Sequence, residues 1–97
     1  MKRSIHRLAE QDLRDAAGFY RREAGAGVAM RFLAEFERVV DLLASEPGIG
    51  TPTADGRQAF PLVGFPYSVI YRHLVDEIRI LVVRHQRRDP RFGSPRG

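Results

Sequence analysis

The chain has 97 residues, no cysteine and a net charge of +4. This length suits one domain, residues 1–97, with a core large enough to fold without cross-links. The absence of cysteine excludes disulfides, thiolate nucleophiles and cysteine-based metal sites, and no stretch approaches the roughly 20 apolar residues that cross a bilayer. We therefore expect a cytoplasmic protein that does not enter the membrane.

The N-terminal half is predicted to form one strand and two helices. Alternation of polar and apolar residues over 4–8 predicts a short edge strand with Ile5 inward. Apolar residues then recur at helical spacing over residues 9–24 and again over 28–45. The glycine-rich link 25–27 is so short that the helices form an antiparallel hairpin, whose apolar stripe needs another layer to cover it.

The C-terminal half is predicted to form a three-stranded antiparallel meander. It follows residues 47–56, whose density of glycine and proline predicts an irregular loop. Residues 58–63 are predicted to be an edge strand, because Pro61 cannot donate to a ladder. Two longer strands follow, over residues 67–74 and 78–85.

The last predicted strand is apolar along most of its length, which is typical of a central strand covered on both faces. Regular alternation predicts one face with Ile78, Ile80, Val82 and Arg84, and the opposite face with Arg79, Leu81, Val83 and His85. The whole layout predicts the α+β class: an N-terminal strand, a helical hairpin and a meander, with the helices on one face of a mostly antiparallel sheet.

The excess positive charge is concentrated at the C-terminal end. From residue 84 onward there are five arginines and one acid, whereas residues 1–83 hold 11 basic and 11 acidic side chains. A concentrated basic patch attracts acidic proteins or phosphates. The alternative is a solvated basic tail without a partner.

No metal or cofactor is expected. His6, His73 and His85 have no metal-ligand spacing, and no acidic cluster accompanies them. The glycine-rich residues 48–56 lack the Gly-Lys-Ser/Thr ending of a phosphate-binding loop.

Two motifs follow the predicted helical hairpin in a fixed order. The first is Pro-Tyr-x-x-x-Tyr at residues 66–71, and the second is His-x-x-Arg-x-Pro at residues 85–90. Together they resemble the RelE/ParE family of bacterial type II toxin-antitoxin toxins. The resemblance implies a growth-inhibiting protein of RelE/ParE-like fold, neutralised by a cognate antitoxin, which alone would contact operator DNA.

Two mechanisms occur in that family. RelE-like members cleave mRNA on the ribosome, whereas ParE-like members inhibit DNA gyrase. Metal-independent RNA cleavage needs a general base, a general acid and cations around the phosphate. The residues that could supply these groups here are His85, Arg57, Arg72, Arg84 and Tyr67. The alternatives are a hydrogen-bonding or surface role for the histidine and a packing role for the tyrosine.

Departures from the RelE-like pattern favour the ParE-like mechanism. Lys2 is the only lysine, so the lysine-rich surface of the nucleases is absent. Gln86 replaces the tyrosine expected after the histidine, and the last aromatic residue, Phe92, cannot exchange a proton. We therefore expect a non-catalytic inhibitor of gyrase rather than an endoribonuclease acting with ribosome and mRNA. A third alternative is an inactive homologue that serves only as a complex subunit.

In the favoured interpretation the C-terminal end binds the target. The expected target-binding residues are Arg84, His85, Arg87, Arg88, Arg91 and Phe92. Their arginines suit charge-assisted contacts to an acidic protein surface or to DNA held by it. The same arginines could instead contact the antitoxin.

Overall fold

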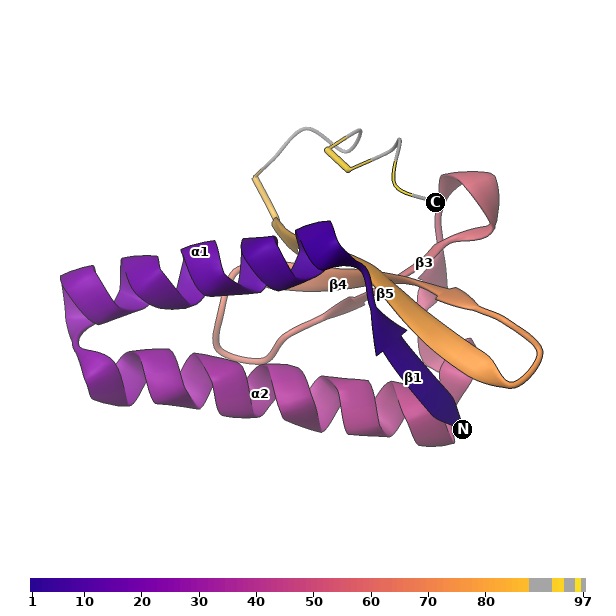
Figure 1. Cartoon of the computed structure of the whole chain (residues 1–97), viewed down its shortest axis with the longest axis horizontal. Helices are drawn as coiled ribbons and strands as arrows, with labels where there is room; N and C mark the ends of the chain where they lie inside the picture. The colour runs from indigo at the N-terminus through magenta and orange to yellow at the C-terminus, as the bar shows by residue number, and fades with distance from the viewer. Residues whose placement is uncertain (88–91, 94–95, 97) are drawn as a thin grey trace.

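Two helices pack on one face of a five-stranded sheet in the computed structural model, which describes residues 1–87, 92–93 and 96 (Figure 1). The elements are β1 (Lys2–Ile5), α1 (Arg7–Ala24), α2 (Ala26–Ser45), β2 (Thr51–Pro52), β3 (Gln58–Pro61), β4 (Tyr67–His73) and β5 (Glu77–His85), with short 3-10 turns at Pro47–Ile49 and Ala54–Gly56. The strand order is β1-β5-β4-β3-β2. Since β1 is parallel to β5 and the other pairs are antiparallel, the predicted α+β architecture is confirmed.

The first strand is an edge strand as predicted, but its position is shifted toward the N-terminus. It covers Lys2–Ile5 rather than residues 4–8. The reason is the cap of α1, where Nδ1 of His6 accepts a hydrogen bond from the Leu8 N–H at 3.0 Å. A side-chain acceptor at this position satisfies an otherwise unpaired helical donor, so the helix begins before the predicted strand would end.

The helical hairpin has a shorter connection than predicted. Gly25 alone separates α1 from α2, with a φ of 99° that its missing side chain permits. The second helix consequently begins at Ala26 and lies beside the first (Figure 1). No helix in the described part of the chain is long and apolar enough to cross a bilayer.

The predicted loop over residues 47–56 contains a short strand. Thr51 pairs with Ala59, and Pro52 pairs with Gln58, so β2 covers one end of β3. The prediction of β3 as an edge strand is therefore wrong for that end. The two residues of β2, Thr51 and Pro52, are too few to give a periodic signal from which this pairing could be expected.

The main core lies between the helices and the sheet. Its largest fully buried side chains are Phe32, Phe36, Val39, Leu43, Val69, Tyr71, Ile78 and Ile80. A smaller cluster lies on the opposite face of the sheet and consists of Ile70, Leu81 and Val82, with Ala59 and Phe92 packed against it. The sheet is thus covered on both faces near its centre, as the apolar sequence of β5 predicted.

A β-bulge in β5 reverses the predicted facing of its last residues. Ile70 pairs with Val82 and Tyr71 pairs with Ile80, so Leu81 is an extra residue on β5. Leu81 and Val82 both belong to the smaller cluster, whereas Val83 belongs to the main core. The predicted alternation therefore holds through Leu81 and is wrong from Val82 onward, and the end of β5 presents Val83 to the helices.

Candidate functional site

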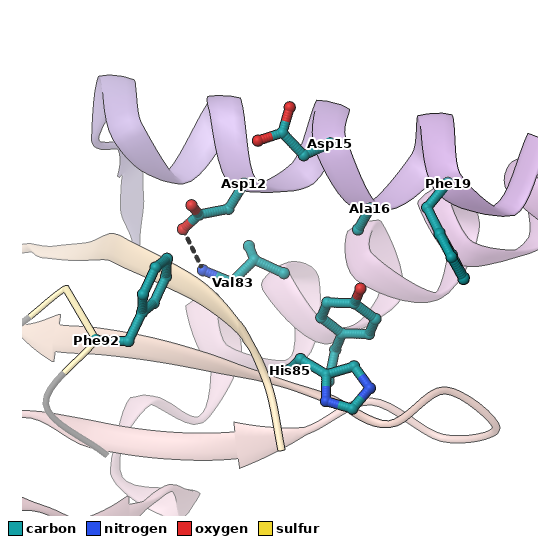
Figure 2. A pocket seen from close by; sticks show the side chains of 8 residues that line it. Asp12, Asp15, Ala16, Phe19, Val83, His85 and Phe92 are labelled. Carbon is teal, nitrogen blue, oxygen red and sulfur yellow. Dashed lines mark hydrogen bonds between the residues drawn. The ribbon is translucent and has the colours of Figure 1, made fainter. Parts of the chain in front are cut away.

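A cleft of about 400 Å³ lies between α1 and the end of β5 (Figure 2). It is lined by Asp12, Asp15, Ala16, Phe19, Tyr67, Val83, His85 and Phe92. The first four come from α1, and Figure 2 shows Asp12, Ala16 and Phe19 pointing toward the sheet, whereas the carboxylate of Asp15 points away from it. The bulge creates this arrangement, because without it His85 would point to the opposite face of the sheet.

His85 is oriented by one ring contact and one hydrogen bond. Its ring centroid is 5.1 Å from that of Tyr67, in an edge-on arrangement with 79° between the planes. Its Nδ1 accepts a hydrogen bond from the Arg87 N–H at 3.1 Å. Because Nδ1 is an acceptor in this contact, Nε2 is the nitrogen that carries the proton of the neutral ring and can donate to a partner.

The base of the cleft is continuous with the aromatic part of the core. The ring of Tyr67 lies 5.3 Å from Phe32 and 6.2 Å from Tyr20. Burial, followed by the neighbouring Tyr67, raises the pKa of the Tyr20 phenol. A neutral aromatic wall of this kind supplies apolar contact area, with the acidic side chain of Asp15 exposed at its edge.

Of the predicted target-binding residues that the structure describes, only His85 and Phe92 line this cleft. Arg87 is exposed on the turn after β5. Arg84 pairs with Ser68 across the sheet, and alternation after the bulge directs it to the face opposite His85. Arg88 and Arg91 lie outside the described residues.

The residues of the nuclease alternative do not assemble at one place. Tyr67 and His85 contact each other on the helix side of the sheet. Arg57 is buried beneath the C-terminal segment, where its Nη1 donates to the Gly93 carbonyl at 3.1 Å and its Nη2 to the Arg96 carbonyl.

Arg72 is also engaged away from the cleft. Its Nη1 donates to the Asp55 carbonyl at 2.6 Å. Burial, followed by the nearby charge of Arg72, lowers the pKa of Arg57, so these two arginines are neighbours of each other. They hold backbone carbonyls, and neither contributes to the lining of the cleft at His85.

The sequence analysis missed the contribution of α1 to the cleft. Asp12 was not among the expected site residues, yet only 10% of its side chain is exposed and it accepts a hydrogen bond from the Val83 N–H at 3.1 Å. Phe19 lines the same cleft and is 49% exposed, and no sequence pattern distinguished it. Within residues 1–87, 92–93 and 96, no group of three or more histidines or acids could hold a metal ion.

Comparison with solved structures identifies the class of protein that this fold defines. The chain superposes on a structure described as the chromosomal ParDE TA system from P. aeruginosa with a TM-score of 0.78 and 25% sequence identity, covering 88% of this chain and 95% of that chain. The fold is therefore that of a toxin-antitoxin protein. No curated protein sequence matches the chain significantly.

The family follows from the sequence model that matches the chain. Residues 4–90 match the model of the ParE toxin of the type II toxin-antitoxin system parDE. The chain belongs to the ParE toxin family. The predicted RelE/ParE resemblance, and the preference for its ParE-like branch, are confirmed.

Proposed function

We propose that this ParE toxin acts in the bacterial cytoplasm by binding DNA gyrase through the cleft at His85 and the basic residues beside it, without catalysis. The separation of Tyr67 and His85 from Arg57 and Arg72 carries this proposal. RNA cleavage needs cations around the phosphate within reach of the proton-transfer groups. Here the two arginines bind carbonyls on another part of the sheet.

The chemistry of the cleft supports a protein target. Phe19 and Phe92 offer aromatic surface, and the Nε2 proton of His85 offers a directional hydrogen bond. Arg87 adds an exposed charge two residues after His85, where it can form charge-assisted hydrogen bonds and accelerate association with an acidic surface. Aromatic residues and arginine are the residue types that contribute most at protein interfaces.

The experiment that tests this function is induction of the toxin without antitoxin, followed by parallel assays of gyrase supercoiling and of ribosome-dependent mRNA cleavage. We expect growth to stop, supercoiling to be lost and mRNA to remain intact. Cut mRNA with normal supercoiling would favour the RelE-like mechanism instead. Normal growth would favour the inactive homologue.

We also propose that a cognate antitoxin covers the groove between α1 and α2. This groove of about 500 Å³ is lined by Leu13, Ala17, Gly18, Ala26, Ala29, Met30 and Leu33, together with Arg14 and Arg21. Its small residues let a helix approach closely, and its arginines complement an acidic one. Operator DNA would then be reached through the antitoxin alone.

Met30→Asp is expected to weaken antitoxin binding by about tenfold or more, because it introduces a charge into an apolar interface. Met30 is 69% exposed in the isolated toxin, so the fold should tolerate the change. Val63→Asp is the matched control, since Val63 is also 69% exposed and lies outside the groove. Equal affinity of the two variants for the protein encoded beside the toxin gene, measured by calorimetry, would contradict the assignment.

A further inference from the structure

The second half of β5 has an edge that no strand among the described residues covers. The parallel strand β1 pairs with residues 77–80 of β5 and ends there, whereas β5 continues to His85. The last backbone hydrogen bond on this side joins the His6 N–H to the Ile80 carbonyl at 2.8 Å. Beyond it, backbone groups of Leu81 and Val83 face α1 and require other partners.

Two side chains from opposite ends of the sequence supply these partners. Oδ2 of Asp12 accepts from the Val83 N–H at 3.1 Å, and Nη1 of Arg96 donates to the Leu81 carbonyl at 3.2 Å. The same two side chains bind each other, with Nη1 at 2.5 Å from Oδ2 and Nη2 at 3.3 Å from Oδ1. The pair closes the edge as a strand would, but with side-chain atoms.

This ion pair is buried enough to matter energetically. The exposed fractions are 11% for the Arg96 side chain and 10% for the Asp12 side chain. Removing one partner of a buried pair leaves the other charge desolvated and uncompensated, which is much more costly than breaking a surface pair. The contact therefore differs in kind from the exposed pair between Arg14 and Glu10, whose side chains are 62% and 54% exposed.

The rest of the described C-terminal segment is held against the same strand. Phe92 packs on the cluster of Leu81 and Val82, and the guanidinium of Arg96 lies 5.1 Å from the Phe92 ring centroid. Gly93 adopts a φ of 79° so close to Val82 that an added Cβ would lie 2.6 Å from a methyl group. Arg57 also holds the segment, since its guanidinium donates hydrogen bonds to the carbonyls of Gly93 and Arg96.

We propose that Asp12 is a positioning residue for target binding: through Arg96 it holds the C-terminal segment against β5 and so fixes Phe92 at the cleft beside His85. The proposal rests on the gyrase-binding function given above. A binding surface that is held in place before the encounter loses less conformational entropy on binding than a free tail does. Asp12 thus increases affinity by fixing the position of Phe92.

The first test measures release of the segment and does not depend on gyrase. Asp12→Asn keeps an oxygen that can accept from the Val83 N–H, but it removes the charge that Arg96 needs. We expect trypsin to cut at or beyond Arg87 about ten- to a hundredfold faster than in the natural chain, as followed by mass spectrometry of the folded protein. Glu10→Gln, an exposed neutralisation on the same helix, is the control and should not change the rate. Equal rates for the two variants would overturn the proposal.

Two further variants separate the ion pair from a general loss of stability. Arg96→Gln should accelerate the same cut as much as Asp12→Asn does, and the double variant should add little, because both changes break one contact. Arg96→Lys keeps a charge and should restore much of the protection. Additive effects, or no recovery with lysine, would show that the two residues do not act on the segment together.

The second test asks whether the position matters for the target. The concentration of toxin that halves gyrase supercoiling should rise about tenfold in Asp12→Asn and stay unchanged in Glu10→Gln. Faster cleavage with unchanged inhibition would overturn the positioning role. If the natural chain itself does not inhibit gyrase, the proposed function fails, while the protease rates still decide whether Asp12 holds the segment.

Discussion

Replacing Arg87 and Arg88 with glutamate is expected to abolish growth inhibition while leaving the fold intact. The change removes two positive charges and adds two negative ones, so the net charge falls from +4 to zero, all of it at the C-terminal end. Arg87 is exposed two residues after His85, which lines the cleft, and Arg88 is its neighbour in the chain. Like charges placed opposite an acidic target surface cost several kcal/mol, which exceeds what a small interface can lose.

The measurement is growth after induction, together with supercoiling by gyrase in the presence of the purified variant. The control reverses two other exposed arginines, Arg7 and Arg31, which gives the same net charge in a different place. The control should remain toxic, and both variants should bind the antitoxin. A double variant at Arg87 and Arg88 that still stops growth would remove the C-terminal end from the target-binding surface.

The fold followed from the sequence wherever one face of an element is apolar and the other polar. In α2 the buried residues Phe32, Phe36, Val39 and Leu43 recur at helical spacing, and the predicted helix was nearly complete. The end of α1 at Gly25 was also predictable, because glycine adopts the positive φ that this position requires without steric cost. For elements with one apolar and one polar face, the sequence therefore predicted both the element and the face that packs in the core.

The facing of β5 could not be predicted, because its centre is apolar on both faces. The residues Ile80, Leu81, Val82 and Val83 are all apolar and all buried. Shifting the strand by one residue would exchange one apolar side chain for another on each face, so the sequence pattern does not indicate which residue faces the helices. The bulge at Leu81 follows from pairing with β4 in three dimensions. This one residue determines which face carries His85, and with it the composition of the cleft.

Only part of the cleft was predictable, because only some of its residues lie close together in the sequence. His85 and Phe92 were identified because they accompany the concentrated charge in one stretch of sequence. Asp12 was not identified, because its ion-pair partner Arg96 is 84 positions away in the sequence and no local pattern connects the two residues. Arg57 was identified as a candidate residue for RNA cleavage, whereas its hydrogen bond to the Gly93 carbonyl depends on the packed structure.

The second prediction with a large expected effect concerns the core beneath the cleft. Phe32→Ala is expected to lower the free energy of unfolding by about 3–5 kcal/mol, out of the roughly 5–15 kcal/mol of a typical domain. Phe32 is fully buried, and its ring centroid is 5.3 Å from each of Tyr20, Phe65 and Tyr67. Truncation to alanine removes buried apolar surface and the three ring contacts. It also leaves a cavity, which the surrounding side chains fill only partially.

Urea unfolding followed by circular dichroism measures this loss. Leu33→Ala is the matched control on the next residue of α2, and its 38% exposure should limit its cost to about 1 kcal/mol or less. Similar costs for the two variants would show that the aromatic cluster is not the main source of stability.

If the expected difference is found, it has a functional consequence, because Tyr67 contacts both Phe32 and His85. Phe32→Ala at a temperature where it remains folded should then inhibit gyrase less than Leu33→Ala does, since the ring that orients His85 has lost its support.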